Sequence, residues 1–540
     1  MTQHRSVARS HLEYIKALGT PVVFGLPGVH NLAYWSDLDE DTPTILGTRH
    51  EQTTVYAADG FARATGLPGF ALTTTGPGAA NAVAAFGEAA ASGSPVVVIA
   101  SEISTKLARP GTVRGVLHES RDQARLFEPL AKAVYRPRTP ADAVSALREA
   151  VAEAMAWPRG PVYLDVPTDV LSMPSPAPAP AGLPQPARRQ PDDAAVRALA
   201  ELIDGSPNVV LWCGGGVVQS GAEDEVRRLA ALLDAPVVTT YAARGLTSPK
   251  DRGHVGLPVH EPEVAALIGD SDLLLAIGTD FDGMMTRNWQ MPMPARLGVV
   301  NQAAEDLSKN YEPDVAVLGD ARDTVRALLP LLPSRRGRSD HADAAGWRRL
   351  EQEPGCREAL DFVRAVDGAV GGETVVVCDM AVAGYWYGGY GQVGRTRALQ
   401  YPIGWGTLGY ALPASIGPAA AGRPTLVVCG DGGVMFGLGE LATLAQGRLP
   451  VTVLVVDDGG YGMLAYDQDV AGHAHRGVDL LGPAWTSLGA AFGIPVTEFE
   501  EPGPALTKSL RTALESGEPH LVVLRADLTP PRTTSPRWFS

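Results

Sequence analysis

Short apolar runs without polar alternation recur along the whole chain, and this pattern constrains the fold most. Strands buried on both faces are continuous in Val, Leu and Ile, whereas strands with one wet face alternate. Longer Ala-, Leu- and Glu-rich stretches, such as 6–19, 51–66 and 149–160, separate the runs and are typical of helices. The predicted strands are 22–28, 43–48, 69–76, 94–102, 208–216, 235–241, 271–279, 373–379, 424–433, 449–458 and 519–527. The pattern predicts an α/β protein with doubly wound, mostly parallel sheets.

Two linkers divide this pattern into three parts. Pro alternates with Ala in 174–191, which favours a stiff extended connector, and 333–345 is polar and charged. The predicted domains are therefore 1–173, 192–332 and 346–540, and each has a usual domain size. Ligands of such sheets bind at the carboxyl ends of strands, so functional residues are expected there.

The composition narrows the class of protein. The 540 residues carry a formal net charge of −15, whereas nucleic-acid and anionic-membrane partners require a basic surface. The four cysteines form no Cys-x-x-Cys pair, and we expect them to be core residues rather than disulfide or zinc ligands. The first residues lack the apolar segment of a secretory signal, and Gly and Pro interrupt the apolar stretch 70–100. We expect a cytoplasmic enzyme with a small-molecule substrate.

The strongest sign of a site lies in the third domain. Asp431 is flanked by glycines at the end of one predicted strand, and Asp457-Asp458 ends the next, with 24 residues between Gly432 and Asp457. Carboxylates at two neighbouring strand ends can bracket one Mg²⁺, which prefers oxygen ligands and often shares them with a phosphate. Glycines and a following helix N-terminus would let backbone N–H groups approach a diphosphate.

This segment resembles the cofactor motif of thiamine-diphosphate (ThDP) enzymes, in which Gly-Asp-Gly is followed at this distance by a pair that is usually Asn-Asn. The resemblance implies Asp431, Asp458 and the Gly460 carbonyl as Mg²⁺ ligands. It implies further cofactor contacts at Gly430, Gly432, Gly433, Tyr461, Gly462 and Met463. Leu464 and Asp467 occupy the place of substrate-pocket residues. Asp458 in place of Asn keeps the oxygen ligand and adds negative charge.

A second segment, 44–66, resembles the glutamate segment of the acetolactate synthase and pyruvate decarboxylase family. The family places this residue, here Glu51, against N1′ of the aminopyrimidine ring. There its shared proton favours the imino tautomer, which deprotonates thiazolium C2. An ordinary carboxylate at a helix N-terminus is the alternative interpretation.

Two glycine-containing turns match the same family. Gly76, Pro77 and Gly78 are expected close to the cofactor or the dimer interface, with a plain strand-to-helix turn as the alternative. The resemblance implies the Gly406 carbonyl as acceptor for the cofactor's 4′-amino group. It also implies Leu408 as the apolar wedge under the bent cofactor.

The expected substrate side departs from its relatives. His118 stands where acetolactate synthases carry an amide, and it is expected to face the reacting carbon and shuttle a proton, with a core or surface histidine as the alternative. Val29 replaces the acidic proton donor of pyruvate decarboxylases. Residues 280–284 lack both arginines of the acetolactate synthase segment, and arginine there helps select a second 2-oxo acid.

Two carboxylates, Glu119 and Asp467, are expected to make part of the pocket acidic. Such a pocket would suit a 2-oxo acid with a cationic tail such as a guanidino group. Alternatively, both carboxylates face solvent or pair with Arg121 and Arg125.

The resemblance implies non-oxidative, ThDP- and Mg²⁺-dependent decarboxylation of a 2-oxo acid through an enamine, with carboligation to an aldehyde or keto acceptor as a further outcome. An acetolactate synthase-like carboligase and a non-catalytic ThDP-binding homologue are the alternatives. A nicotinamide oxidoreductase lacks its Gly-x-Gly-x-x-Gly fingerprint here. Three alternatives stay open for the middle domain: it binds FAD, it binds ADP, or it binds no nucleotide. A homodimer or homotetramer is expected, because the family builds each site from the first domain of one subunit and the third domain of another.

Overall fold

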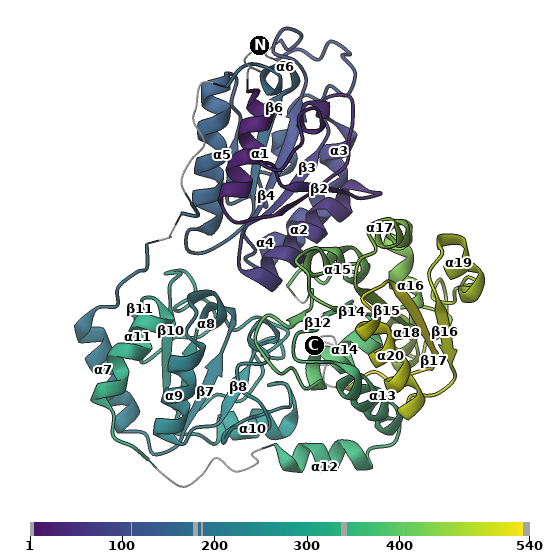
Figure 1. The fold of residues 1–540 in the computed structure, drawn as a ribbon. Helices are drawn as coiled ribbons and strands as arrows, with labels where there is room; N and C mark the ends of the chain where they lie inside the picture. Colours follow the sequence, from purple (N-terminus) through teal and green to yellow (C-terminus); the bar gives the residue numbers. More distant parts are fainter. Residues whose placement is uncertain are drawn as a thin grey trace.

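Three α/β domains make up the computed structural model, which describes residues 5–109, 111–175, 182–184, 187–335, 343–402 and 404–532. The first domain lies at the top of Figure 1, the middle domain at lower left and the third at lower right. Every strand pair within the three sheets is parallel, as the continuous apolar runs predict. Much of the two expected linkers, at 176–181, 185–186 and 336–342, lies outside the described residues.

The first domain is a six-stranded sheet in the order β2-β1-β3-β4-β6-β5. Its strands are β1 (Val22–Gly25), β2 (Thr44–Gly47), β3 (Gly69–Thr73), β4 (Val96–Glu102), β5 (Ala133–Tyr135) and β6 (Val162–Pro167). Its helices are α1 (Val7–Ala17), α2 (Glu51–Thr65), α3 (Pro77–Asn81), α4 (Val83–Ala91), α5 (Pro140–Met155) and α6 (Thr168–Leu171). Two of these strands were not predicted from the sequence: β5 is short, and β6 contains a polar residue and ends in Pro.

The middle domain is a five-stranded sheet in the order β11-β10-β9-β7-β8. Its strands are β7 (Val209–Cys213), β8 (Val237–Thr239), β9 (Leu273–Ile277), β10 (Leu297–Asn301) and β11 (Val315–Leu318). Its helices are α7 (Asp193–Asp204), α8 (Gly215–Ser220), α9 (Glu223–Leu233), α10 (Pro262–Gly269) and α11 (Ala321–Leu328). Strands β10 and β11 were also not predicted.

The third domain repeats the strand order of the first, as β13-β12-β14-β15-β17-β16. Its strands are β12 (Val375–Cys378), β13 (Leu399–Gln400), β14 (Thr425–Gly430), β15 (Val451–Asp457), β16 (Val496–Phe499) and β17 (His520–Arg525). Its helices are α12 (Ala344–Gln352), α13 (Cys356–Ala369), α14 (Val382–Tyr390), α15 (Ala411–Ala420), α16 (Asp431–Val434), α17 (Leu441–Gly447), α18 (Gly462–Val470), α19 (Trp485–Phe492) and α20 (Pro504–Ser516).

The single helix expected after Gly432 is instead three short pieces. A 3₁₀ segment, η5 (Met435–Glu440), separates α16 from α17, and Gly437 within it has non-helical dihedrals (φ −121°, ψ 16°). A Cβ added at Gly437 would lie 2.8 Å from the Pro413 ring, so the segment bends where it packs closely on α15. The strand-end loop is therefore followed by a compact, irregular stretch rather than by one long helix.

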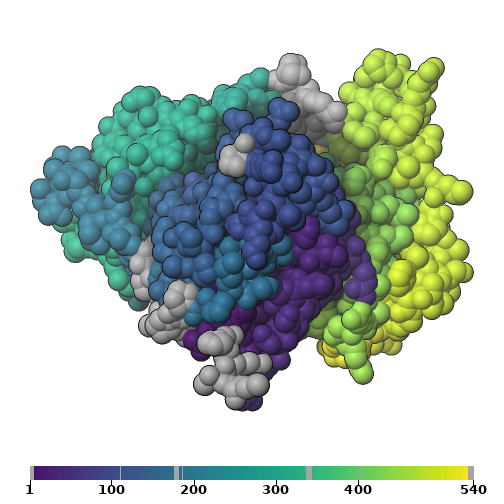
Figure 2. Space-filling view, turned by 90° about the horizontal axis from the view of Figure 1, so that it is seen from above, coloured from purple at the N-terminus to yellow at the C-terminus, as the bar shows by residue number. Residues whose placement is uncertain are grey.

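The first and third domains are joined through α2 and α15, whose backbones touch. A Cβ added at Gly60 would overlap the carbonyl oxygen of Ala414, so only glycine permits this approach. Arg63 on α2 forms a two-point ion pair with Asp59 (3.0 and 2.9 Å) and a second ion pair with Glu88 (2.9 Å). Figure 2 shows the first domain from above, between the other two.

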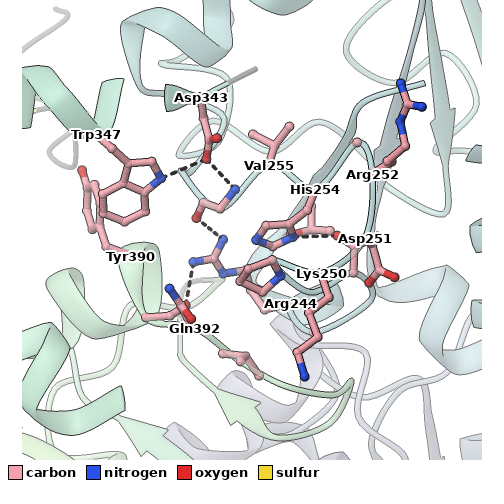
Figure 3. Close-up of a pocket in the computed structure, with 18 of the residues that line it drawn as sticks. Arg244, Lys250, Asp251, Arg252, His254, Val255, Asp343, Trp347, Tyr390 and Gln392 are labelled. Carbon is pink, nitrogen blue, oxygen red and sulfur yellow. Dashed lines mark hydrogen bonds between the residues drawn. The ribbon is translucent and has the colours of Figure 1, made fainter. Parts of the chain in front are cut away.

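The middle and third domains meet around a cavity of about 490 Å³ (Figure 3). The buried guanidinium of Arg244 donates to the carbonyl of Gly256 in its own domain (2.7 Å) and to that of Gly391 in the third (3.1 Å). Asp343 accepts from the Gly256 N–H (2.7 Å) and the Trp347 indole (3.0 Å). These bonds fix the relative position of the two domains.

All four cysteines, Cys213, Cys356, Cys378 and Cys429, are buried, and three of them lie in central strands as expected. Within the described part of the chain, no helix is long and apolar enough to cross a membrane.

Candidate cofactor and active site

Four neighbouring strands of the first domain end at one edge of the sheet, and each is followed by residues of the expected site. Glu51 follows β2, Gly76 follows β3, and His118 lies in the loop after β4. The turn that contains Val29 follows β1, and Val29 itself is 59% exposed. This arrangement agrees with the rule that ligands of parallel sheets bind at strand carboxyl ends.

Glu51 is the first residue of α2, where its charge also complements the helix N-terminus. One oxygen, Oε2, accepts a hydrogen bond from the Asn81 side chain (3.0 Å). The other, Oε1, lies near Gly78, where an added Cβ would come within 3.2 Å of it and within 2.6 Å of Thr74 Cγ2. Asn81 therefore orients the carboxylate, and Gly78 leaves room beside it.

The Gly76-Pro77-Gly78 turn lies between Glu51 and His118. Gly76 has φ +67°, and a Cβ at this position would lie 2.6 Å from the His118 carbonyl oxygen. The buried side chain of Gln123 accepts from the Gly76 N–H (2.5 Å) and donates to the Ser101 carbonyl (3.0 Å). One short turn thus fixes the spacing of the two residues expected to handle protons.

His118 has a left-handed backbone conformation (φ +65°) that is uncommon outside glycine. The following residue stabilises its turn, because Glu119 Oε2 accepts the N–H groups of Arg114 (2.7 Å) and Val116 (3.0 Å). These N–H groups also lower the pKa of the Glu119 carboxyl. Glu119 Oε2 is therefore bound by backbone N–H groups of its own loop.

In the third domain, β14 and β15 run in register, with Gly430 opposite Val456, so Asp431 and Asp458 emerge at adjacent strand ends. Asp431 is 2% exposed, and neither of its carboxylate oxygens accepts a hydrogen bond in the described structure. Asp458 is half-buried, and its Oδ1 accepts the Gly460 N–H (3.2 Å). Burial and the facing Asp431 raise the pKa of Asp458 to about 7, and burial also raises that of Asp431. A buried carboxylate without hydrogen bonds that faces a second, half-buried carboxylate fits a divalent cation.

The glycines around these carboxylates are required by close contacts. A Cβ added at Gly432 would lie 2.6 Å from the Tyr461 ring, and one at Gly433 would lie 2.6 Å from Asp379 Oδ2 and 3.1 Å from Leu408 Cδ1. The same addition at Gly460 would lie 2.5 Å from the Val478 carbonyl oxygen. The motif therefore leaves the backbone at Gly432 and Gly433 bare of side chains.

The two aspartates at the end of β15 have different surroundings. Asp457 accepts from the Trp485 indole (2.6 Å) and pairs with Arg525 (3.4 Å). Asp458 instead points toward Gly462, where a Cβ would overlap its Oδ2. Asp458 is therefore the member of the pair that is available to a metal ion.

The turn after β13 brings the expected wedge residue to this motif. Gly406 (φ +75°) and Gly409 (φ +85°) allow the turn, and Leu408 lies half-buried against Gly433. Buried Asp379 accepts the Gly409 N–H (2.9 Å), and burial raises the pKa of this carboxyl to about 7. Trp405, which precedes Gly406 in the chain, packs over Gly87 of the first domain.

Helix α18 carries the remaining expected pocket residues. Met463 packs against the buried core, whereas Leu464 is 45% exposed. Leu464 and Asp467 line a hollow of about 340 Å³ together with His473 and Arg476. An arginine in this hollow makes it less acidic than the sequence analysis expected.

Four residues of this arrangement were not singled out from the sequence: His30, Asn81, Gln123 and Asp379. Their positions depend on contacts between distant segments. The only available signal was that His30 and Asn81 closely follow a predicted strand and that Asp379 ends one, and Gln123 lacks even this signal.

No group of three or more His, Cys, Asp and Glu side chains that could hold a metal occurs within the described residues. Mg²⁺ often binds through one or two carboxylates and completes its shell with substrate phosphates and water. The Asp431–Asp458 pair supplies the two carboxylates that such a site would need.

A further cavity of about 540 Å³ borders Gly214, Gly215 and Gly216 in the middle domain and Arg159 in the first. Its size is usual for small-ligand sites. This is where a nucleotide would bind if the middle domain holds one.

Three family models match consecutive parts of this chain. They are the N-terminal TPP binding domain (residues 5–126), the central domain (196–328) and the C-terminal TPP binding domain (379–524) of thiamine pyrophosphate enzymes. The chain belongs to the thiamine-diphosphate-dependent enzymes, as the motifs in its first and third domains predict.

The chain is similar over nearly its whole length to several relatives. It is 32% identical over 521 residues to a Pseudomonas aeruginosa protein named probable 2-ketoarginine decarboxylase. The matched region covers 94% of this chain and 91% of that protein. It is 28% identical to a probable acetolactate synthase large subunit of Methanocaldococcus jannaschii, with 96% and 92% covered. A candidate thiamin diphosphate-dependent enzyme from Mycobacterium smegmatis, of known crystal structure, shares the fold (TM-score 0.78, 24% identity, 97% and 99% covered).

Proposed function

We propose that this protein catalyses ThDP- and Mg²⁺-dependent, non-oxidative decarboxylation of a 2-oxo acid, with carboligation to a carbonyl acceptor as a side reaction. The observation that carries the proposal is the turn Gly76–Gly78, which separates Glu51 from His118 by one tight bend. When bound, ThDP supplies the electron sink for the pair left by the departing carboxylate. The protein's own residues then decide where protons go.

Glu51 is suited to hold a proton at N1′ of the cofactor's aminopyrimidine, since Asn81 fixes one oxygen and the other faces the space beside Gly78. His118 is suited to deliver a proton to the carbon that loses CO₂. Asp431 and Asp458 would hold Mg²⁺, and the bare glycines beside them would admit the diphosphate. Leu408 against Gly433 would support the cofactor from below.

We further propose a 2-oxo acid with a cationic tail as the first substrate to test. The relative named 2-ketoarginine decarboxylase supports this choice, and Asp467 on α18 offers a carboxylate. Purified protein loaded with ThDP and Mg²⁺ is given 2-oxo acids with cationic, apolar and acidic tails, and CO₂, aldehydes and acyloins are measured. CO₂ with an aldehyde as the main product supports the proposal.

Acetolactate synthesis is the second candidate, because several relatives carry that name. Asp280 pairs with Lys309 (2.7 Å) at the place where acetolactate synthases have arginine, which speaks against this candidate. Acetolactate as the dominant product from pyruvate alone would decide for it.

A protein that binds ThDP but releases no CO₂ from any 2-oxo acid would be the non-catalytic homologue. A yellow colour of the purified protein would reveal FAD in the middle domain.

We also propose a homodimer or homotetramer whose sites lie between subunits. Large apolar side chains are exposed at the site edges of both domains, including Leu117 (62%) in the first and Trp405 (52%) and Phe436 (59%) in the third. Exposed apolar patches of this kind mark interaction sites.

Complementation tests the shared site. Glu51→Gln and Asp431→Ala are each expected to be inactive, but a mixed dimer places both defects in one site and leaves the other intact. Co-expressed variants should recover about a quarter of the wild-type activity, and light scattering should show no monomer. Mixed dimers without activity would contradict the arrangement.

A further inference from the structure

The turn after β1 contains a second histidine, His30, whose ring lies against that of His118. The ring centroids are 5.2 Å apart and the planes are inclined by 73°, an edge-to-face arrangement. The two residues are 88 positions apart in the chain, and each follows a different strand of the first sheet. We propose that His30 acts together with His118, so that the two imidazoles serve as one proton donor that directs the reaction to an aldehyde; this rests on the proposed function.

Both histidines are held by rigid backbone. The His30 turn is braced by buried Asn31, which accepts from the Gly28 N–H (2.7 Å) and donates to the Leu26 carbonyl (3.1 Å). The Glu119 carboxylate stabilises the turn that contains His118, and the backbone of His118 has the left-handed conformation described above. Strained conformations of this kind persist where the surrounding structure determines them, and they cluster at functional sites.

The two turns converge on the space beside Glu51. Thr74 packs against Gly28 on one side, where a Cβ would lie 2.6 Å from Thr74 Cβ, and against Gly78 on the other. Gly78 in turn borders Glu51 Oε1. The histidine pair and the carboxylate therefore surround the same turn, although they come from three separate segments.

The electrostatics of the pair favour a single charge. The Nδ1 atoms of both rings are buried, and neither has a hydrogen-bond partner in the described structure. Burial, and secondarily His118, lower the pKa of His30. Two imidazolium ions at this separation would repel each other, which disfavours a second positive charge on the pair.

This arrangement suits the protonation step. The bond between the carbonyl carbon and the carboxylate breaks, CO₂ leaves, and the electron pair remains available at the former carbonyl carbon. His118 then gives its proton to form the new C–H bond and becomes neutral. Water then reprotonates the histidine pair for the next cycle. No oxidant or reductant is required.

The test separates CO₂ release from aldehyde formation. His30→Phe keeps an aromatic ring at the contact and removes the imidazole, so the melting temperature and single-turnover CO₂ release should match those of the wild type. Aldehyde formation should fall about 10-fold, and acyloin should rise when an acceptor aldehyde is added. Imidazole in the buffer should restore aldehyde formation to His30→Ala. His520→Gln, at the start of β17, is the control histidine.

Each outcome decides a question. Wild-type aldehyde formation in His30→Phe overturns the inference. Parallel loss of melting temperature, CO₂ release and aldehyde, with no effect of imidazole on His30→Ala, also overturns it, because the residue would then be merely structural. If the wild-type protein releases CO₂ from no 2-oxo acid, the proposed function itself is wrong.

Discussion

The first and third domains have the same strand order, but the ends of their strands carry different side chains. In the first sheet, the segments after β1 to β4 present a carboxylate and two imidazoles, which are suited to hold and move protons. In the third sheet, the corresponding segments present a buried and a half-buried aspartate and bare glycines, which suit a metal ion and a diphosphate. The topology therefore sets where a ligand binds, and a few residues at the strand ends set what is done to it.

The largest effect is expected from the third domain. Asp431→Ala removes one of the two carboxylates available to Mg²⁺, so metal and ThDP binding should both be lost. Calorimetric titration with ThDP in the presence of Mg²⁺ measures this directly, and a normal melting temperature of the apo-protein controls for folding. If Asp431→Ala bound ThDP with wild-type affinity, the proposed Mg²⁺ site at this edge of the sheet would be wrong.

A smaller loss with a different signature is expected from the first domain. Glu51→Gln keeps the shape of the side chain but cannot exchange the proton, so turnover should fall about 10²–10⁴-fold. ThDP affinity should stay within a few-fold of wild type, in contrast to Asp431→Ala. If the two variants lose affinity equally, the division of labour between the domains is wrong.

A matched pair of glycine variants sharpens the comparison. Gly76→Ala places a methyl group 2.6 Å from the His118 carbonyl oxygen at a positive φ, so it should lower the turnover number more than ThDP affinity. Gly433→Ala places one 2.6 Å from Asp379 Oδ2 and should chiefly weaken ThDP binding, by about 10-fold. Steady-state kinetics and titration on both proteins would show whether the two effects divide in this way.

The smallest effect is expected from Asp458→Asn. An amide oxygen can still coordinate Mg²⁺, and the change removes one of two repelling negative charges. Activity at saturating Mg²⁺ should remain within about 3-fold of wild type, with the metal dependence as the measurement. A loss as severe as that of Asp431→Ala would show that the second negative charge is required.

Much of this arrangement could be predicted because it depends on local sequence. The parallel sheets follow from unbroken apolar runs, and the placement of Asp431 beside Asp458 follows from the ends of two consecutive strands. Strands such as Val162–Pro167 and Val496–Phe499 were missed because polar residues interrupt them. Their formation depends on the neighbouring strand rather than on their own composition.

The histidine pair could not be predicted for a different reason. His30 and His118 meet only because the loop after β4 crosses over the turn after β3, and nothing in either segment encodes that crossing. The backbone hydrogen bonds of Glu119 could likewise not be predicted, because they depend on the shape of the loop. Residue type alone suggested a pocket acid.

The buried ion network of Arg63, Asp59 and Glu88 has an evolutionary consequence. Both carboxylates are fully buried, and Glu88 also accepts from Thr407 of the third domain (3.0 Å). Replacing one member alone leaves an uncompensated buried charge, at a cost of about 3–5 kcal/mol. Substitutions at these three positions are therefore expected to occur together in homologues, whereas the exposed faces of the same helices can vary freely.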